Sequence, residues 1–177
     1  MEVDGGSGST RRRVFPLLWL ASGSVLVAAS AGAVLRGPGT ASGLVALAAG
    51  IVLVLGRRAA TRRGSPEDRM ASSFLDRAFD GCVLGAVAWV SRDADPAVAL
   101  GALLALSLSF LAAYVRARGA ALGYGIGESG VTAGLRYALV VIGVAYDALA
   151  WTIWGVAGLS ALSLLVRSSQ VVKEERA

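Results

Sequence analysis

The sequence contains no histidine and only one cysteine among its 177 residues, and charged residues make up only 16% of it. Without histidine, the chain cannot use Ser/His or Cys/His nucleophilic pairs, and it lacks the most common ligand of haem and zinc. The single cysteine, Cys82, excludes an internal disulfide bond. Any chemistry therefore depends on carboxylates, arginines and a metal ion taken from solution.

Apolar residues account for 55% of the chain and are gathered into long runs, such as 17–35, 43–55 and 96–115. These runs are continuous rather than alternating, and their lengths approach what is needed to cross about 30 Å of hydrocarbon. We therefore predict an all-α, polytopic membrane protein with about six transmembrane helices. The predicted helices are 14–35, 42–57, 70–91, 96–118, 131–147 and 149–167.

The segments at the two ends of the chain are more polar than the rest. Residues 1–13 begin with glycine, serine and acidic residues, and we expect a short disordered cytoplasmic leader. Residues 14–167 are predicted to form the transmembrane domain, and residues 168–177 a cytoplasmic tail. The basic start followed by an apolar stretch resembles a secretory signal, but its length and the spans that follow favour an uncleaved first helix.

Basic residues alternate along the chain between rich and poor connections. The poor connections contain little more than Arg36 and Arg92. The rich segments hold Arg11, Arg12 and Arg13; Arg57, Arg58, Arg62, Arg63 and Arg69; Arg116 and Arg118; and Arg167, Lys173 and Arg176. This alternation follows the positive-inside rule and predicts a multi-pass protein of the cell (plasma) membrane with both termini in the cytoplasm. It also explains the net charge of +5, so we expect membrane lipid and no nucleic acid as partner.

Two acidic residues lie inside the predicted third helix, near its cytoplasmic start. Asp76 and Asp80, in the sequence SSFLDRAFDGC, are four residues apart, which places both carboxylates on one helical face within reach of a single ion. Acidic side chains at membrane depth are costly unless they are paired, hydrated or bound to a cation. The residues alone leave two interpretations open: a metal site, or pairing with arginines such as Arg57, Arg58 or Arg77.

Two arginines end the predicted fourth helix on the same side of the membrane. Arg116 and Arg118 occur in the sequence YVRARGAALG. They either belong to the positive-inside signal or form a phosphate clamp, because arginine presents a fork of donors to phosphate oxygens. Carboxylates, a hard divalent metal and arginines at one membrane face have the composition of a phosphoryl-transfer site.

Two segments, FLDRAFDG around Asp76 and SFLAAYVRARGAALG at 109–123, resemble the CDP-alcohol phosphatidyltransferase family, in particular its actinobacterial phosphatidylinositol-phosphate synthase-like branch. The family signature is DxxDGxxAR, eight residues, then GxxxDxxxD, and its second half aligns with Ser72, Asp76 and Asp80. The resemblance implies a homodimeric six-helix bundle that transfers a phosphatidyl group from a CDP-linked lipid, such as CDP-diacylglycerol, to an alcohol in phospholipid biosynthesis.

The resemblance also implies roles for individual residues. Asp76 and Asp80 would bind metal, Mg²⁺ or Mn²⁺, within a centre of four aspartates and two ions, and Asp80 would act as the catalytic base. Arg63 would contact the nucleotide, and Arg116 and Arg118 the phosphate. A carboxylate beside a cation can accept the proton of the alcohol while the metal stabilises the diphosphate leaving group.

The first half of the signature departs from this pattern. Leu55 and Arg58 stand where its two aspartates are expected, and Arg63 is the one residue of that half that matches. Three hypotheses follow: a transferase with an altered site; a catalytically degenerate homologue in which Arg58 or Arg63 neutralises the aspartates, serving as a membrane subunit or lipid-binding protein; and an unrelated small transporter or scaffold.

Overall fold

The computed structural model describes the backbone of residues 6–63, 65–124 and 130–174, and the side chains of 18–62, 65–124 and 134–172. Within these ranges every regular element is helical, which confirms the predicted all-α class. The elements are α1 (Gly6–Leu35), α2 (Thr40–Arg63), α3 (Pro66–Ser91), α4 (Pro96–Ala121), α5 (Gly130–Ala145) and α6 (Leu149–Glu174).

Most helices continue past the ends that the apolar runs predict. α1 begins at Gly6, so residues 6–13 are helical where a disordered leader was expected, and α6 continues to Glu174 through most of the predicted tail. α2 reaches Arg63 and α3 begins at Pro66. The reason is that an apolar run measures the hydrocarbon that a helix crosses, whereas backbone hydrogen bonding continues into the polar region beyond it.

Local sequence signals fix the starts of two helices. Ser65 caps α3 and its hydroxyl accepts a hydrogen bond from the backbone N–H of Asp68, with Pro66 in the first turn. Asp95 caps α4 in the same way, and its Oδ1 accepts from the backbone N–H groups of Ala97 at 3.1 Å and Val98 at 3.2 Å. Such caps satisfy N–H groups that have no partner within the helix, so both helices start sharply.

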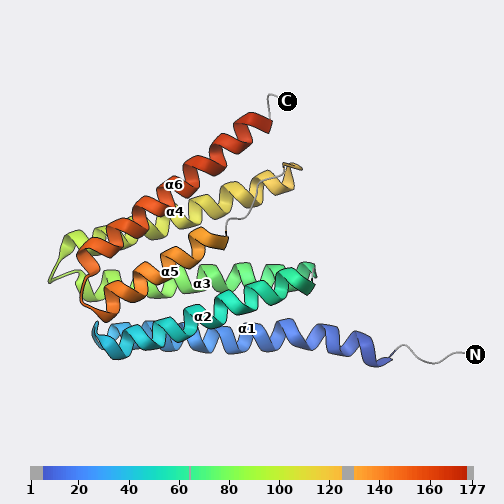
Figure 1. Cartoon of the computed structure of the whole chain (residues 1–177), viewed down its shortest axis with the longest axis horizontal. Coiled ribbons are helices and arrows are strands. Elements are labelled where there is room, and N and C mark those ends of the chain that lie inside the picture. The colour runs from blue at the N-terminus through green and yellow to red at the C-terminus, as the bar shows by residue number, and fades with distance from the viewer. Residues whose placement is uncertain (1–5, 64, 125–129, 175–177) are drawn as a thin grey trace, which may run out of the picture.

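Consecutive helices run in opposite directions, so α1 begins and α6 ends at the same end of the bundle (Figure 1). We call this the basic end, because it contains Arg57, Arg116 and Arg167. The other end carries the turns that join α1 to α2, α3 to α4, and α5 to α6, and we call it the turn end (Figure 1). This separation matches the alternation of basic residues in the sequence.

α3 is the central helix of the bundle. It packs against α1, α2 and α4, while α4 also packs on α6, and α5 packs on α2 and α6. Leu75, Phe79, Val83 and Val87 of α3 are almost completely buried. The same helix buries five polar side chains against its neighbours: Asp68, Ser72, Asp76, Asp80 and Ser91.

Within the described residues, four helices, α1, α2, α4 and α6, are long and apolar enough to cross a membrane, which indicates a membrane protein. Large apolar side chains on these helices point away from the bundle, including Leu18, Leu44, Leu103 and Leu165. α3 is interrupted by charged side chains and the described apolar part of α5, Gly134–Ala145, is shorter. These two helices therefore do not meet by themselves the length and apolarity of a membrane span.

Candidate functional site

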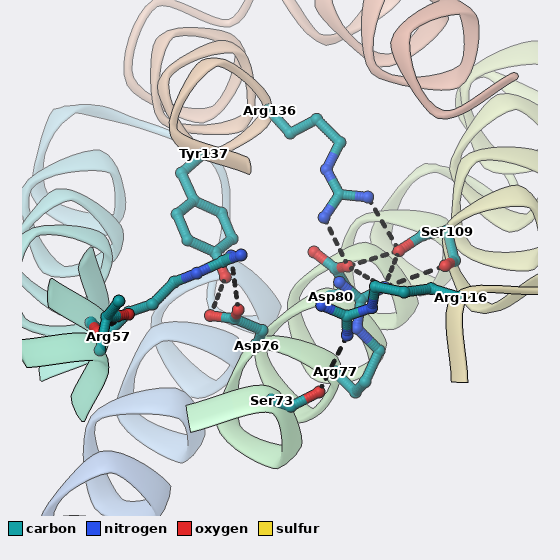
Figure 2. A network of polar contacts seen from close by, with 10 residues as sticks. Arg57, Ser73, Asp76, Arg77, Asp80, Ser109, Arg116, Arg136 and Tyr137 are labelled. Atoms are coloured by element: carbon teal, nitrogen blue, oxygen red, sulfur yellow. Dashed lines mark hydrogen bonds and ion pairs between the residues drawn. The ribbon is translucent and has the colours of Figure 1, made fainter. Parts of the chain in front are cut away.

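The acidic pair of α3 lies inside the bundle at its basic end. Asp76 and Asp80 are 6% and 5% exposed and point to the same side of α3, as their spacing predicts. Side chains from α2, α4 and α5 approach them from that side (Figure 2). Two buried carboxylates at such close spacing require strong compensation, because burial removes the water that would stabilise their charge.

Both oxygens of Asp76 have a partner. The Oδ2 atom is 3.0 Å from Nη1 of Arg57, and Oδ1 accepts a hydrogen bond from the hydroxyl of Tyr137 at 2.8 Å. Tyr137 is itself buried, and its ring meets Phe79 edge to face with the ring centroids 4.8 Å apart. Asp76 therefore links α3 to α2 through an ion pair and to α5 through a buried hydroxyl.

Asp80 is compensated by two guanidinium groups. Its Oδ2 atom lies 3.1 Å from Nη1 of Arg77 and 3.1 Å from Nη2 of Arg136, and it accepts a hydrogen bond of 2.5 Å from the hydroxyl of Ser109. That hydroxyl also accepts from Nη1 of Arg136 at 2.9 Å and from Arg77. Asp80, Ser109 and the two arginines thus form one network across α3, α4 and α5 (Figure 2).

More positive charge surrounds this network. Arg116 donates from Nη2 to the hydroxyl of Ser73 at 3.2 Å, and Arg167 donates from Nη1 to the backbone carbonyl of Ala112 at 2.7 Å. Both arginines lie near the like charges of Arg57 and Arg77. The described side chains around the acidic pair thus include five arginines: Arg57, Arg77, Arg116, Arg136 and Arg167.

The structure brings together some of the residues that the sequence singled out, but not all. Asp76, Asp80 and Arg116 lie in one neighbourhood (Figure 2). Arg118 is exposed, outside this network, since two residues along a helix point to different faces. Arg63 closes α2, and its side chain lies outside the described residues.

The arginine that pairs with Asp76 is Arg57, one of the partners considered from the residues alone, and not one of the two that the alignment suggested. The alignment indicated Arg58 or Arg63 for this role, but Arg58 is exposed, and Arg57 makes the ion pair instead. Consecutive residues on a helix are rotated by about 100°, so only one of the two can face α3. The expectation that Arg58 neutralises the aspartates is therefore wrong.

Three residues of the network were not assigned a role from the sequence: Ser109, Arg136 and Tyr137. Arg136 is 8% exposed, within a helix that is otherwise mostly apolar. An arginine in such a position is by itself a signal for a functional or structural partner, because its burial needs a counter-charge. Ser109 gives no such signal, since serine is common in transmembrane helices and its partners lie far away in the sequence.

The arrangement does not fit a centre of two divalent ions. Mg²⁺ requires several oxygen ligands in octahedral geometry, but both oxygens of Asp76 already have partners and Asp80 is paired with two cations. Leu55 and Arg58 stand where further aspartates would be needed, and both are exposed. Among the described residues, no group of three or more acidic, cysteine or histidine side chains is placed to hold a metal.

No protein-family model matches this chain, and no curated protein sequence matches it. The meaning of the network therefore follows from its own charges and contacts. Its parts come from α2, α3, α4 and α5, so the assembled bundle, rather than any one segment, creates it.

Proposed function

We propose that this chain is a CDP-alcohol phosphatidyltransferase-like membrane protein that acts as a lipid-binding membrane subunit rather than as a metal-dependent transferase. The observation that carries the proposal is the compensation of both aspartates by arginines of the same chain. A catalytic carboxylate must be free to accept a proton, and a metal centre needs free carboxylate oxygens. In this arrangement both oxygens of Asp76 and the Oδ2 atom of Asp80 already have partners, which leaves too few free oxygens for a centre of two ions.

The excess of arginine over carboxylate supports an anionic lipid as the ligand. A guanidinium group binds phosphate oxygens through two parallel hydrogen bonds. Arg116 and Arg167 lie in the last third of α4 and of α6, towards the basic end, which in the proposed topology is the side of the cytoplasmic headgroups. Positive charge at this position also attracts the anionic lipids of a cytoplasmic leaflet. A phosphate-bearing headgroup would relieve the mutual repulsion of these arginines.

The membrane topology that we propose has six crossings, with both termini at the cytoplasmic face of the plasma membrane. α3 can cross because α1, α2 and α4 surround it, and α5 because it packs on α2 and α6. The basic end then faces inward, as the positive-inside rule requires. Arg118→Cys and Asp147→Cys, each in a Cys82→Ser background, test this: an impermeant thiol reagent added to cells should label only the cysteine at position 147.

The lipid-binding proposal is tested by titrating the purified, detergent-solubilised protein with CDP-diacylglycerol in a calorimeter, with Mg²⁺, with Mn²⁺ or with a chelator. We expect binding in all three conditions, with no release of CMP. Arg116→Met should weaken binding at least several-fold, whereas Arg118→Met, an exposed arginine on the same helix, serves as the matched control. Metal-dependent CMP release that is lost in Asp80→Asn would overturn the proposal.

The second candidate is the transferase itself, which the resemblance implies. The observation in its favour is the placement of Asp76 and Asp80 on one face of α3, with Arg116 of α4 nearby. Arg57, Arg77 and Arg136 would have to leave the carboxylates when donor lipid and metal bind. Release of CMP from CDP-diacylglycerol, tested with a panel of alcohols and either metal, distinguishes the two candidates. Light scattering of the same sample tests the homodimer that the resemblance also implies.

A further inference from the structure

The acidic pair contacts three guanidinium groups that come from three different helices. Arg57 belongs to α2, Arg77 to α3 and Arg136 to α5, and each lies 3.0–3.1 Å from a carboxylate oxygen. The side chains of the three arginines are 21%, 22% and 9% exposed, respectively. These are buried or half-buried pairs, so their charges are only weakly screened by water.

The contacts of Arg136 and Tyr137 show that the pairing also connects helices. α5 packs on α2 and α6, and these two consecutive residues reach α3 with their side chains (Figure 2). Arg136 contacts Asp80 and Ser109, while Tyr137 contacts Asp76. The acidic pair is therefore one point at which α5 is held to the centre of the bundle, beside the contact of Tyr137 with Phe79.

We infer that Arg57, Arg77 and Arg136 take the place of divalent cations at the acidic pair, as counter-ions supplied by the chain itself. This inference deepens the proposed function and rests on its premise that Asp76 and Asp80 are not catalytic. A guanidinium group is always charged and is fixed covalently to its helix, so it compensates a carboxylate at any metal concentration. The fold is thereby independent of divalent metal, and the carboxylates become available to a cation only when the arginines are removed.

The first test is thermal unfolding of the detergent-solubilised protein. We expect the same Tm in a chelator as in Mg²⁺ or Mn²⁺. Arg136→Met leaves Asp80 with less compensation and should lower the Tm by about 10 °C. Adding Asp80→Asn to Arg136→Met should restore part of this loss, because the second change removes the uncompensated charge. Arg118→Met, which changes an exposed arginine, should shift the Tm by less than about 2 °C.

The second test asks whether a metal can replace the missing arginines. We expect Mn²⁺, detected by electron paramagnetic resonance, to bind Arg57→Met/Arg136→Met but not the unchanged protein, and the binding to disappear when Asp76→Asn is added. If the double variant does not fold, the same question is put to Arg136→Met alone, where Mn²⁺ should raise the Tm by several degrees.

Three results would overturn the inference: a fall in the Tm of the unchanged protein in chelator, a loss in Arg136→Met no larger than in Arg118→Met, or no effect of Mn²⁺ on the arginine variants. These results are separate from those that bear on the proposed function. Release of CMP that persists in Asp80→Asn and in Asp76→Asn, with no effect of chelator on the Tm of the unchanged protein, would contradict the lipid-binding proposal alone.

Discussion

At the turn end Arg92 pairs with Asp93, and at the basic end Arg136 pairs with Asp80, in both cases at 3.1 Å. The first pair has side chains that are 47% and 82% exposed, whereas those of the second are 9% and 6% exposed. An exposed pair contributes little to stability because water competes for both charges, while breaking a buried pair leaves a charge without water or partner. The two ion pairs have the same length but are therefore expected to contribute unequally to the stability of the fold.

The turn end depends on packing and on its interface with the surroundings rather than on buried charge. Trp89, Trp151 and Trp154 are exposed there, as expected for indoles in the headgroup region, and the Arg92 guanidinium lies 4.0 Å from the centre of the Trp89 ring. Close backbone approach joins α2 to α5 at Gly43, where a Cβ would lie 2.7 Å from the Cα of Ala145. This end should respond to changes in side-chain volume, and the basic end to changes in charge.

Asp80→Ala should have the largest effect, because it leaves the guanidinium groups of Arg77 and Arg136 buried without their counter-charge. We expect a loss of about 3–5 kcal/mol, seen as a large fall in the Tm of the detergent-solubilised protein. Asp93→Ala at the turn end is the matched control. Similar losses in the two variants would remove the distinction between the ends.

Tyr137→Phe should have the next largest effect. The substitution keeps the edge-to-face contact with Phe79 but removes the hydroxyl that donates to Asp76. Hydrogen bonds to charged groups contribute about 1.5–3 kcal/mol, so we expect a loss of that size in thermal unfolding. Combining Tyr137→Phe with Asp76→Asn should give less than the sum of the two single losses, and strict additivity would argue against a direct interaction.

Gly43→Leu tests the turn end through volume. The new side chain would collide with the backbone of Ala145 and force α2 away from α5, with an expected loss of about 1–3 kcal/mol. Gly32→Leu in α1 is the control, because nothing lies within 4 Å of a Cβ at that glycine. A Tm that falls equally in both variants would show that the effect comes from the larger side chain rather than from the helix crossing.

Asp93→Asn should have the smallest effect. It removes the exposed ion pair with Arg92 but keeps the size of the side chain, so the expected change is below about 1 kcal/mol. Thermal unfolding in low and high salt measures this change. In the unchanged protein, high salt should screen the pair and lower the Tm by a similarly small amount. A loss comparable to that of Tyr137→Phe would mean that the turn end also relies on charge.

The positions of the described helices along the chain could be predicted well from the sequence, because long apolar runs mark helices and Pro/Gly-rich segments mark the breaks between them. Asp95 and Pro96, for example, mark the start of α4, where the structure shows a capped helix. The helix ends near the basic end were harder to predict, since an arginine-rich segment such as 57–63 continues a helix without an apolar signal. The central position of α3 depends on packing between helices, which no local pattern contains.

The candidate site could be predicted only in part. The spacing of Asp76 and Asp80 placed them on one face of a helix, but it could not tell a metal ion from an arginine as their partner. That choice depends on contacts with Arg136 and Tyr137, which are 56 and 61 residues away in the sequence from the carboxylates that they contact. It also depends on the rotation of α2, which directs Arg57 rather than Arg58 towards α3.

The separation of 56 residues between Asp80 and Arg136 also bears on how the protein is made. At about 5–20 residues per second, a ribosome completes α5 several seconds after α3. During that interval Arg57 and Arg77 are the available counter-charges, and Tyr137 and Arg136 do not yet exist. The compensation of Asp80 is therefore complete only after the fifth helix has been synthesised.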